Sequence, residues 1–404
     1  MSSIDVRPAR LNTAKIAVGV TFGMNGLALA GWLARAPAVR DGLDLSVAGF
    51  GLLLLCMSGT SVASIPLAGP LVQRVGPARA VLAASMSMAF GLAVLGTATL
   101  IGSVVLAGSA LLFCGFGTST WDVAMNVEAA DVERRLGRTV MPRFHAGFSL
   151  GTVAGAGVGA VTAAAGVPVW AQLYFTTAVV VAVQTAVVRR FLPHADPEPG
   201  AKPAMTAGQA WREPRTLLIG LILLGFGFTE GSANDWLAIS LVDGYHAGDT
   251  VGAVGFGVFV TAMTLGRMYG GPATDRWGRV PVLRLTAVSA TAGLLLVVFG
   301  GTVPLALAGA LLWGVGASLG FPIGMSAAAD DPVRAAIRVS VAGSIGYAAF
   351  LAGPPLIGVL SQHLGIRNGL LCVFGALVIG LAASHAAKPL LPAGATPPTP
   401  PPHS

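Results

Sequence analysis

Long apolar runs, separated by short segments that carry the charges, fill most of this 404-residue chain. A helix needs about 20 mostly apolar residues to cross a hydrocarbon layer about 30 Å thick. Because apolar residues occupy every side of these runs and do not alternate with polar ones, the pattern predicts membrane helices and not barrel strands. It predicts twelve, at residues 13–34, 47–71, 78–98, 102–127, 144–166, 169–189, 217–239, 251–271, 281–300, 303–326, 338–360 and 365–386.

The longest polar interruption divides the predicted helices into two groups of six. We expect a short cytoplasmic tail at 1–12, a six-helix bundle at 13–188, a cytoplasmic linker rich in proline and charge at 189–216, a second six-helix bundle at 217–387 and a disordered proline-rich tail at 388–404. The predicted fold class is therefore an all-α integral membrane protein with two six-helix halves.

The basic residues predict the orientation of the chain. If the N-terminus is cytoplasmic, the outer loops hold only Arg35, Arg40 and Arg367, and almost all other basic residues lie on the inner side. Loops that stay inside are enriched in Lys and Arg. We therefore expect a multi-pass protein of the cell (inner or plasma) membrane with both termini cytoplasmic.

Composition excludes several classes of protein. Charged residues are 10% of the chain, against about 25% in soluble domains, and hydrophobic residues are 54%. A soluble enzyme, a nucleic-acid binder and a disordered protein are excluded. There is no phosphate-binding loop, zinc spacing or nucleophile elbow, and the three cysteines lie in apolar runs. We expect no enzymatic activity, no metal and no cofactor, with the lipid bilayer as partner and a monomeric chain.

An internal repeat relates the two halves. The Phe-Gly and Trp-Leu-Ala motifs at 22–23 and 32–34 recur 204 residues later at 226–227 and 236–238. The loops after the second and eighth predicted helices also match, as GPLVQRVG at 69–76 and GPATDRWGR at 271–279. Many transporters are built from repeated halves.

The second of these loops resembles the signature loop of the major facilitator superfamily, and the resemblance extends over about residues 12–387 through helix number, orientation and central linker. Gly69 and Gly271 permit a close approach of helices, and Gly76 and Gly278 permit a tight turn. Asp275 is placed to cap a neighbouring helix or to pair with an arginine.

By resemblance to the family, Asp275, Arg276 and Arg279 would latch the outward-open state. The first copy has Gln73 in place of the acid, so beside Arg74 we expect at most a hydrogen-bonded latch. Residues in the fourth, fifth and seventh predicted helices are also similar to the branch around fucose permease and its uncharacterised bacterial relatives.

The seventh predicted helix holds the clearest candidate site, because ionisable groups within a membrane are costly and usually functional. Glu230 lies about 14 residues from the inner end, roughly 20 Å deep at 1.5 Å per residue. We expect it to face a central cavity, where it binds substrate or carries a coupling proton; the alternative is a carboxyl bonded to a neighbouring helix. Asn234 shares its face, and Asp235 is rotated away.

Two further groups are candidates for the cavity. Asp122 and Asn126 lie one turn apart, and either line the inner cavity or tie their helix to His145 and Arg143. By resemblance to the family, whose first helix lines the cavity, Asn25 and Trp32 would contact substrate. Separately, four glycines at 147, 151, 155 and 159 predict a stripe for close helix packing.

The predicted function is secondary active transport of a small organic solute by alternating access, coupled to protons as in a symporter, with a sugar or polar metabolite favoured. One alternative is efflux of a drug or metabolite by antiport, although the Gly-Pro pair of drug antiporters is absent from the fifth predicted helix. An alternative of another class is a membrane sensor or partner subunit that does not transport.

Overall fold

The computed structural model describes residues 8–45, 47–193, 205–247 and 249–390. Throughout these residues the regular structure is helical, which confirms the predicted all-α class. Residues 1–7, 194–204 and 391–404, which belong to the predicted tail, linker and proline-rich tail, lie outside the described part.

The first half begins with α1 and continues through α3, α4, α5, α6 and α7 as its long helices. A short helix, α2, follows α1 and contacts α4, and a 3-10 turn, η1, follows α7. The bounds are α1 Pro8–Leu33, α2 Ala36–Gly42, α3 Val47–Val75, α4 Pro77–Ile101, α5 Val104–Leu136, α6 Met141–Ala164, α7 Val169–Val187 and η1 Val188–Arg190.

The second half repeats this plan after the short linker helix α8. Two of its membrane passages are broken: α12 is followed by α13, and α15 by α16 and the 3-10 turn η2. The bounds are α8 Ala207–Ala210, α9 Pro214–Tyr245, α10 Asp249–Trp277, α11 Arg279–Phe299, α12 Val303–Ala317, α13 Gly320–Ala328, α14 Ala335–Leu364, α15 Ile366–Gly369, α16 Cys372–Ala383 and η2 Ser384–Ala387.

The predicted membrane passages are found along the chain. Ten helical segments in the described residues are long and apolar enough to cross a membrane, and α10 and α14 occupy the two remaining predicted positions. The passage predicted as one helix over 303–326 is broken after Ala317, and Ser318 and Leu319 separate α12 from α13. Such a break is tolerated where neighbouring groups satisfy the freed backbone.

Several boundaries predicted from hydropathy are wrong. Helix α1 begins at Pro8, within the predicted tail 1–12, and α9 begins at Pro214, within the predicted linker 189–216. Helix α5 continues to Leu136, nine residues past its predicted end at 127. These helix ends carry polar and charged residues, so an apolar run cannot reveal them, although their backbone hydrogen bonds continue the helix.

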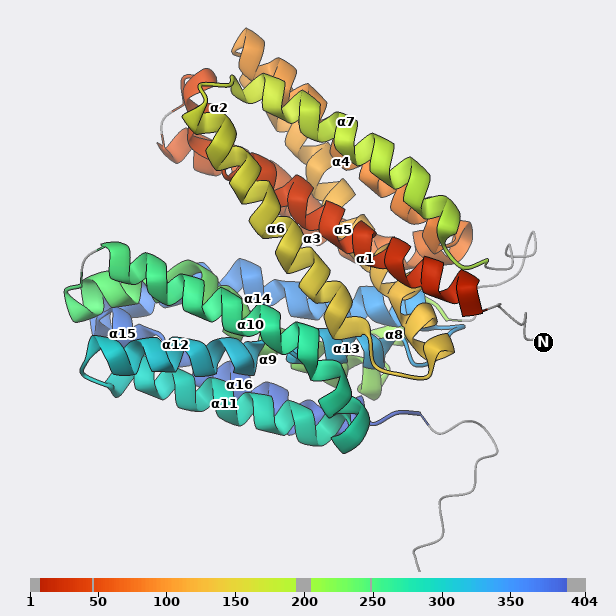
Figure 1. The fold of residues 1–404 in the computed structure, drawn as a ribbon, viewed down its shortest axis with the longest axis vertical. Helices are drawn as coiled ribbons and strands as arrows, with labels where there is room; N and C mark the ends of the chain where they lie inside the picture. The colour runs from red at the N-terminus through yellow and green to blue at the C-terminus, as the bar shows by residue number, and fades with distance from the viewer. Residues whose placement is uncertain (1–7, 46, 194–204, 248, 391–404) are drawn as a thin grey trace, which may run out of the picture.

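Both halves are bundles that meet at one end and diverge at the other (Figure 1). We call the end near α8 and α13 the closed end, and the end with α2 and α15 the open end. Helix α1 packs on α6 in the first half as α9 packs on α14 in the second, and α4 packs on α5 as α11 packs on α12. The structural pairing follows the repeat seen in the sequence.

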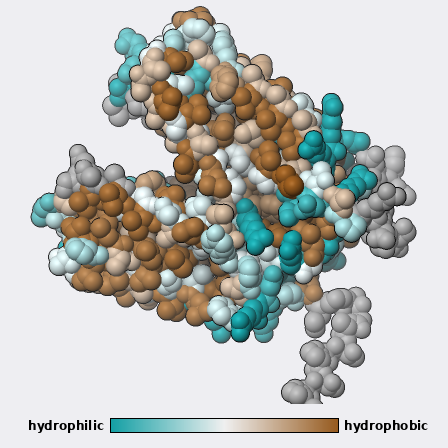
Figure 2. Space-filling view, viewed as in Figure 1, coloured by the Kyte–Doolittle hydropathy of each residue, from teal (hydrophilic) through white to brown (hydrophobic). Residues whose placement is uncertain are grey.

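The glycine stripe of α6 forms the contact with α1. A Cβ atom added at Gly151 would lie 1.9 Å from the carbonyl oxygen of Gly23, and one at Gly155 would lie 2.5 Å from that of Leu27. The predicted close packing is thereby confirmed. Large apolar side chains cover the outer face of both bundles, and hydrophilic residues gather toward the closed end (Figure 2).

Candidate functional site

A central cavity of about 570 Å³ lies between the two halves. Four ionisable groups line it among mostly apolar and aromatic side chains: Asp122 and His145 from the first half, and Glu230 and Arg267 from the second. This size and lining suit a small organic ligand, because ligand sites are largely apolar with a few placed polar groups. The aromatic lining residues are Phe22, Trp32, Phe148, Phe321, Tyr347 and Phe350.

Glu230 on α9 forms an ion pair with Arg267 on α10, and Oε2 lies 2.7 Å from Nη2. The two side chains are 15% and 4% exposed. Arg267 Nη1 also donates to Ser149 Oγ on α6 at 2.9 Å, and Nε donates to the Ser318 carbonyl at 3.3 Å. That carbonyl is freed by the break after α12. The guanidinium therefore links both halves at the cavity wall.

Asp122 lines the cavity from α5, and Asn126 lies behind it. The Asn126 amide donates to the Asp122 carbonyl at 2.9 Å and to its carboxylate at 3.3 Å. Asn126 Oδ1 is hydrogen-bonded to His145 Nε2 at 3.2 Å. Arg143 is not part of this series of hydrogen bonds. Its Nε instead donates to the Met268 carbonyl on α10 at 3.3 Å. The structure thus places Asp122 at the cavity and Asn126 against His145.

The other candidate residues are divided by whether they line the cavity. Asn25, Trp32 and Asn234 line the cavity, and Asn25 Oδ1 accepts a hydrogen bond from Thr118 at 3.2 Å. Trp32 is 1% exposed, so its side chain is packed within the protein. Asp235 is exposed and is not among the residues that line the cavity, in keeping with its rotation away from Glu230.

Arg267 is the site residue that sequence reasoning missed. Arg267 lies within the predicted helix at 251–271, four residues from its end. The rule that singled out Glu230, the cost of an ionisable group in a membrane, applies equally to a cation. That signal could have identified Arg267, although its partner could not be read from the chain.

The two signature segments, 69–76 and 271–279, were predicted as loops but are helical as far as Val75 and Trp277. At the closed end, both contact the opposite half. A Cβ at Gly69 would lie 2.6 Å from Ser340 Cβ on α14, and one at Gly271 would lie 2.6 Å from the Thr139 carbonyl. Asp275 Oδ1 accepts a hydrogen bond from the Thr139 amide at 2.8 Å, just before α6 begins. Gly76 and Gly278 have φ of 80° and 82°, which L-residues with a Cβ rarely adopt.

The arginines of these loops differ in their surroundings. Arg74 is exposed. Arg276 is exposed and lines a second hollow of about 440 Å³ together with Arg138 and Arg143. Arg279 Nη1 pairs with Asp330 at 2.8 Å, and Nη2 donates to Ser326 Oγ at 2.7 Å.

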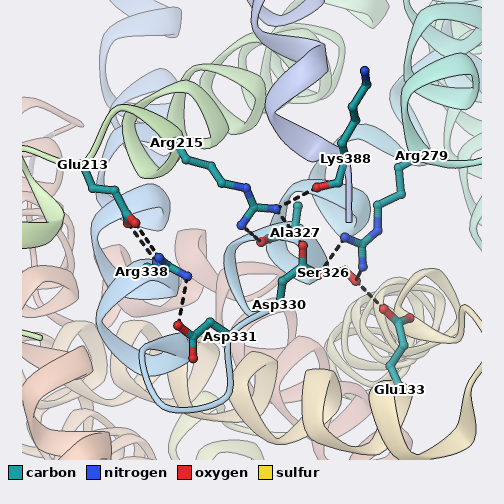
Figure 3. A network of polar contacts seen from close by, with 10 residues as sticks. All are labelled: Glu133, Glu213, Arg215, Arg279, Ser326, Ala327, Asp330, Asp331, Arg338 and Lys388. Carbon is teal, nitrogen blue, oxygen red and sulfur yellow. Dashed lines mark hydrogen bonds and ion pairs between the residues drawn. The ribbon is translucent and has the colours of Figure 1, made fainter. Parts of the chain in front are cut away.

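A polar network extends this contact between the halves (Figure 3). Ser326 on α13 donates to Glu133 on α5, which also accepts from the amides of Val140 and Met141 at 2.8 and 2.6 Å. Arg279, Ser326 and Glu133 thus join the second half to the first. The start of α9 joins the network through Arg215, which pairs with Asp330 at 2.7 Å. Glu213, which directly precedes α9, accepts from Arg338 Nε at 2.8 Å.

Glu213 makes one part of the network dependent on pH. Burial raises the pKa of Glu213, but hydrogen bonds from Arg338 and Thr216 outweigh it and hold the pKa below its usual 4.5. A carboxyl with a lowered folded-state pKa stabilises the fold above its usual pKa, and this contribution is lost as pH falls through the lowered value.

We expect Arg338→Gln to lower the melting temperature at pH 7 and to lower it progressively less below about pH 4.5. Thermal unfolding of both proteins across this pH range measures the gap, and a gap that stays constant would contradict the assignment.

Comparison with known proteins places the chain in a family. It matches the model of the Major Facilitator Superfamily over residues 13–336 and 236–403. An uncharacterised transporter of Sinorhizobium fredii is 33% identical over 93% of this chain and 97% of its own. An uncharacterised MFS-type transporter of Yersinia pestis is 31% identical over 92% of this chain and 94% of its own.

Solved structures share the fold. The crystal structure of the MFS transporter FucP in its outward conformation has a TM-score of 0.79 at 14% identity, covering 93% of this chain and 99% of that one. A bacterial homologue of the iron transporter ferroportin, in an outward-facing state, has a TM-score of 0.75 at 13% identity, covering 94% and 99%. The superfamily predicted from the signature loop is confirmed, and the chain belongs to the major facilitator superfamily of membrane transporters.

Proposed function

We propose that this protein imports a small polar organic solute together with protons, by alternating access. The observation that carries the proposal is the Glu230–Arg267 ion pair at the wall of a cavity between two repeated halves. When a proton neutralises Glu230, Arg267 loses its partner and becomes available to other acceptors, so proton binding and solute binding are coupled at one place.

In this proposal the closed end is cytoplasmic, because the arginines concentrate there and basic loops stay inside. The cavity is then accessible from outside, and Asp275, Arg279 and Glu133 would hold the cytoplasmic side shut. Asn25, Trp32 and Asn234 would contact the solute, and His145 would hold Asn126. FucP, which shares the fold, is described as a fucose:proton symporter, which supports the choice of coupling ion.

The proposal is tested by uptake into proteoliposomes. The purified protein is reconstituted, and uptake of radiolabelled sugars, polyols and amino polyols is measured with an inward proton gradient. We expect accumulation of at least one solute, which a protonophore abolishes, and we expect Glu230→Gln to prevent accumulation. Accumulation that a protonophore leaves unchanged would refute proton coupling, and the lack of uptake of every solute would refute transport of this class.

A further inference from the structure

We infer that the transported solute carries a protonated amine, and that Asp122 binds it. This inference rests on the proposed transport function and names its substrate class. It follows from the charges that line the cavity and from the partners that each charged group has.

Three of the four ionisable lining groups are accounted for without a ligand. Glu230 and Arg267 neutralise one another across 2.7 Å. His145 is hydrogen-bonded to Asn126 and lies between the rings of Phe22 and Phe321, with ring centroids 5.2 and 5.9 Å away. Ser149, one turn further along α6, accepts from Arg267, so a charged imidazole would lie beside an existing cation. The neutral form of His145 is therefore favoured.

Asp122 is the group that remains. Asp122 is only 8% exposed, and it lines the cavity. Its carboxylate accepts from the Asn126 amide at 3.3 Å and from the Tyr347 hydroxyl, both of which are neutral donors. Within the described ranges no Lys, Arg or His lies at ion-pair distance from it. A buried carboxylate without a counter-ion is strongly disfavoured. Asp122 is thus the one cavity carboxyl whose ionised form lacks a counter-ion, and a bound cation would supply it.

The surroundings of Asp122 favour an organic ammonium group as the counter-ion. Hard metal ions take about six to eight oxygen ligands, and the described residues contain no cluster of three ligating side chains. Phe22, Trp32 and Tyr347 line the same cavity, and aromatic faces attract organic cations. Asn25 and Asn234 add amide groups that suit hydroxyls. The lining therefore fits a small amino polyol.

Three six-carbon polyols of similar size test the inference: glucamine, which is a cation at pH 7, sorbitol, which is neutral, and gluconate, which is an anion. Affinities are measured by isothermal titration calorimetry on the purified full-length protein, and melting temperatures at saturating ligand provide a second measurement. We expect glucamine to bind at least about tenfold more tightly than sorbitol, the size expected for one charge-assisted hydrogen bond, and gluconate to bind most weakly.

Asp122→Asn, which keeps the shape of the side chain, should remove the preference for glucamine over sorbitol. The matched control is Asp41→Asn, because Asp41 lies on α2 with a side chain 65% exposed and pairs with Arg40; it should keep the preference. The absence of a glucamine preference in the unmodified protein, or its persistence in Asp122→Asn, overturns the inference. Proton-driven uptake of a neutral or anionic solute would then still uphold the proposed function.

Discussion

Replacement of Arg267 by Gln is expected to abolish transport and to destabilise the protein. The substitution leaves the Glu230 carboxylate buried without its partner and removes the hydrogen bond to Ser149 in the other half. Loss of one partner of a buried ion pair costs about 3–5 kcal/mol. We expect a clear fall in melting temperature and a fall in transport rate of more than about a hundredfold, measured by thermal unfolding and by proteoliposome uptake.

The double variant Glu230→Gln/Arg267→Gln separates the two effects. It removes both charges, so we expect it to recover most of the melting temperature but none of the proton-driven accumulation. Arg40→Gln is the matched control, because Arg40 pairs with Asp41 on the surface, where ion pairs contribute at most about 1 kcal/mol. An Arg267→Gln protein as stable and as active as the unmodified protein would contradict the role of the pair.

The second large effect concerns the packing of α6 on α1. The Cβ atom of Gly151→Ala would lie 1.9 Å from the Gly23 carbonyl oxygen, a backbone atom that cannot rotate away. The two helices must separate, and overpacking of this kind costs about 1–3 kcal/mol or more. We expect a large fall in melting temperature and in the yield of folded protein, measured by size-exclusion chromatography of heated samples.

Gly157→Ala provides a control on the same helix. A Cβ at Gly157 meets no atom within 4 Å, so the substitution adds helix propensity without a clash. Its expected effect is neutral or stabilising, opposite in sign to that of Gly151→Ala. Equal effects at the two positions would show that the stripe does not determine how closely α1 and α6 pack.

The fold could be predicted from the sequence because its main determinants are local. Apolar runs marked the membrane passages, the repeated motifs at 22–34 and 226–238 marked the two halves, and the glycine spacing in α6 marked a close contact. Helix ends beyond the apolar layer could not be predicted, because α5 continues past 127 as a polar helix that carries Asp131 and Glu133. The break after Ala317 was also missed, because hydropathy describes side chains and does not report which backbone carbonyls are hydrogen-bonded.

The site could be predicted only in part, because its contacts depend on how helices rotate and pack. Glu230, Asp122 and Trp32 could be selected one by one from the cost of polar groups in a membrane and from their spacing. The pairing of Glu230 with Arg267 could not, since the two lie on different helices and share a third contact with Ser149 of the other half. The sequence therefore named candidates, and the structure supplied their partners.

Proton movement through Glu230 is tested most directly by the internal pH of proteoliposomes when an accumulated solute is added outside. With no imposed gradient, we expect the unmodified protein to acidify the lumen as solute enters. Glu230→Gln should exchange labelled for unlabelled solute across the membrane without any change in internal pH. Acidification by Glu230→Gln equal to that of the unmodified protein would contradict the assignment of the coupling proton to Glu230.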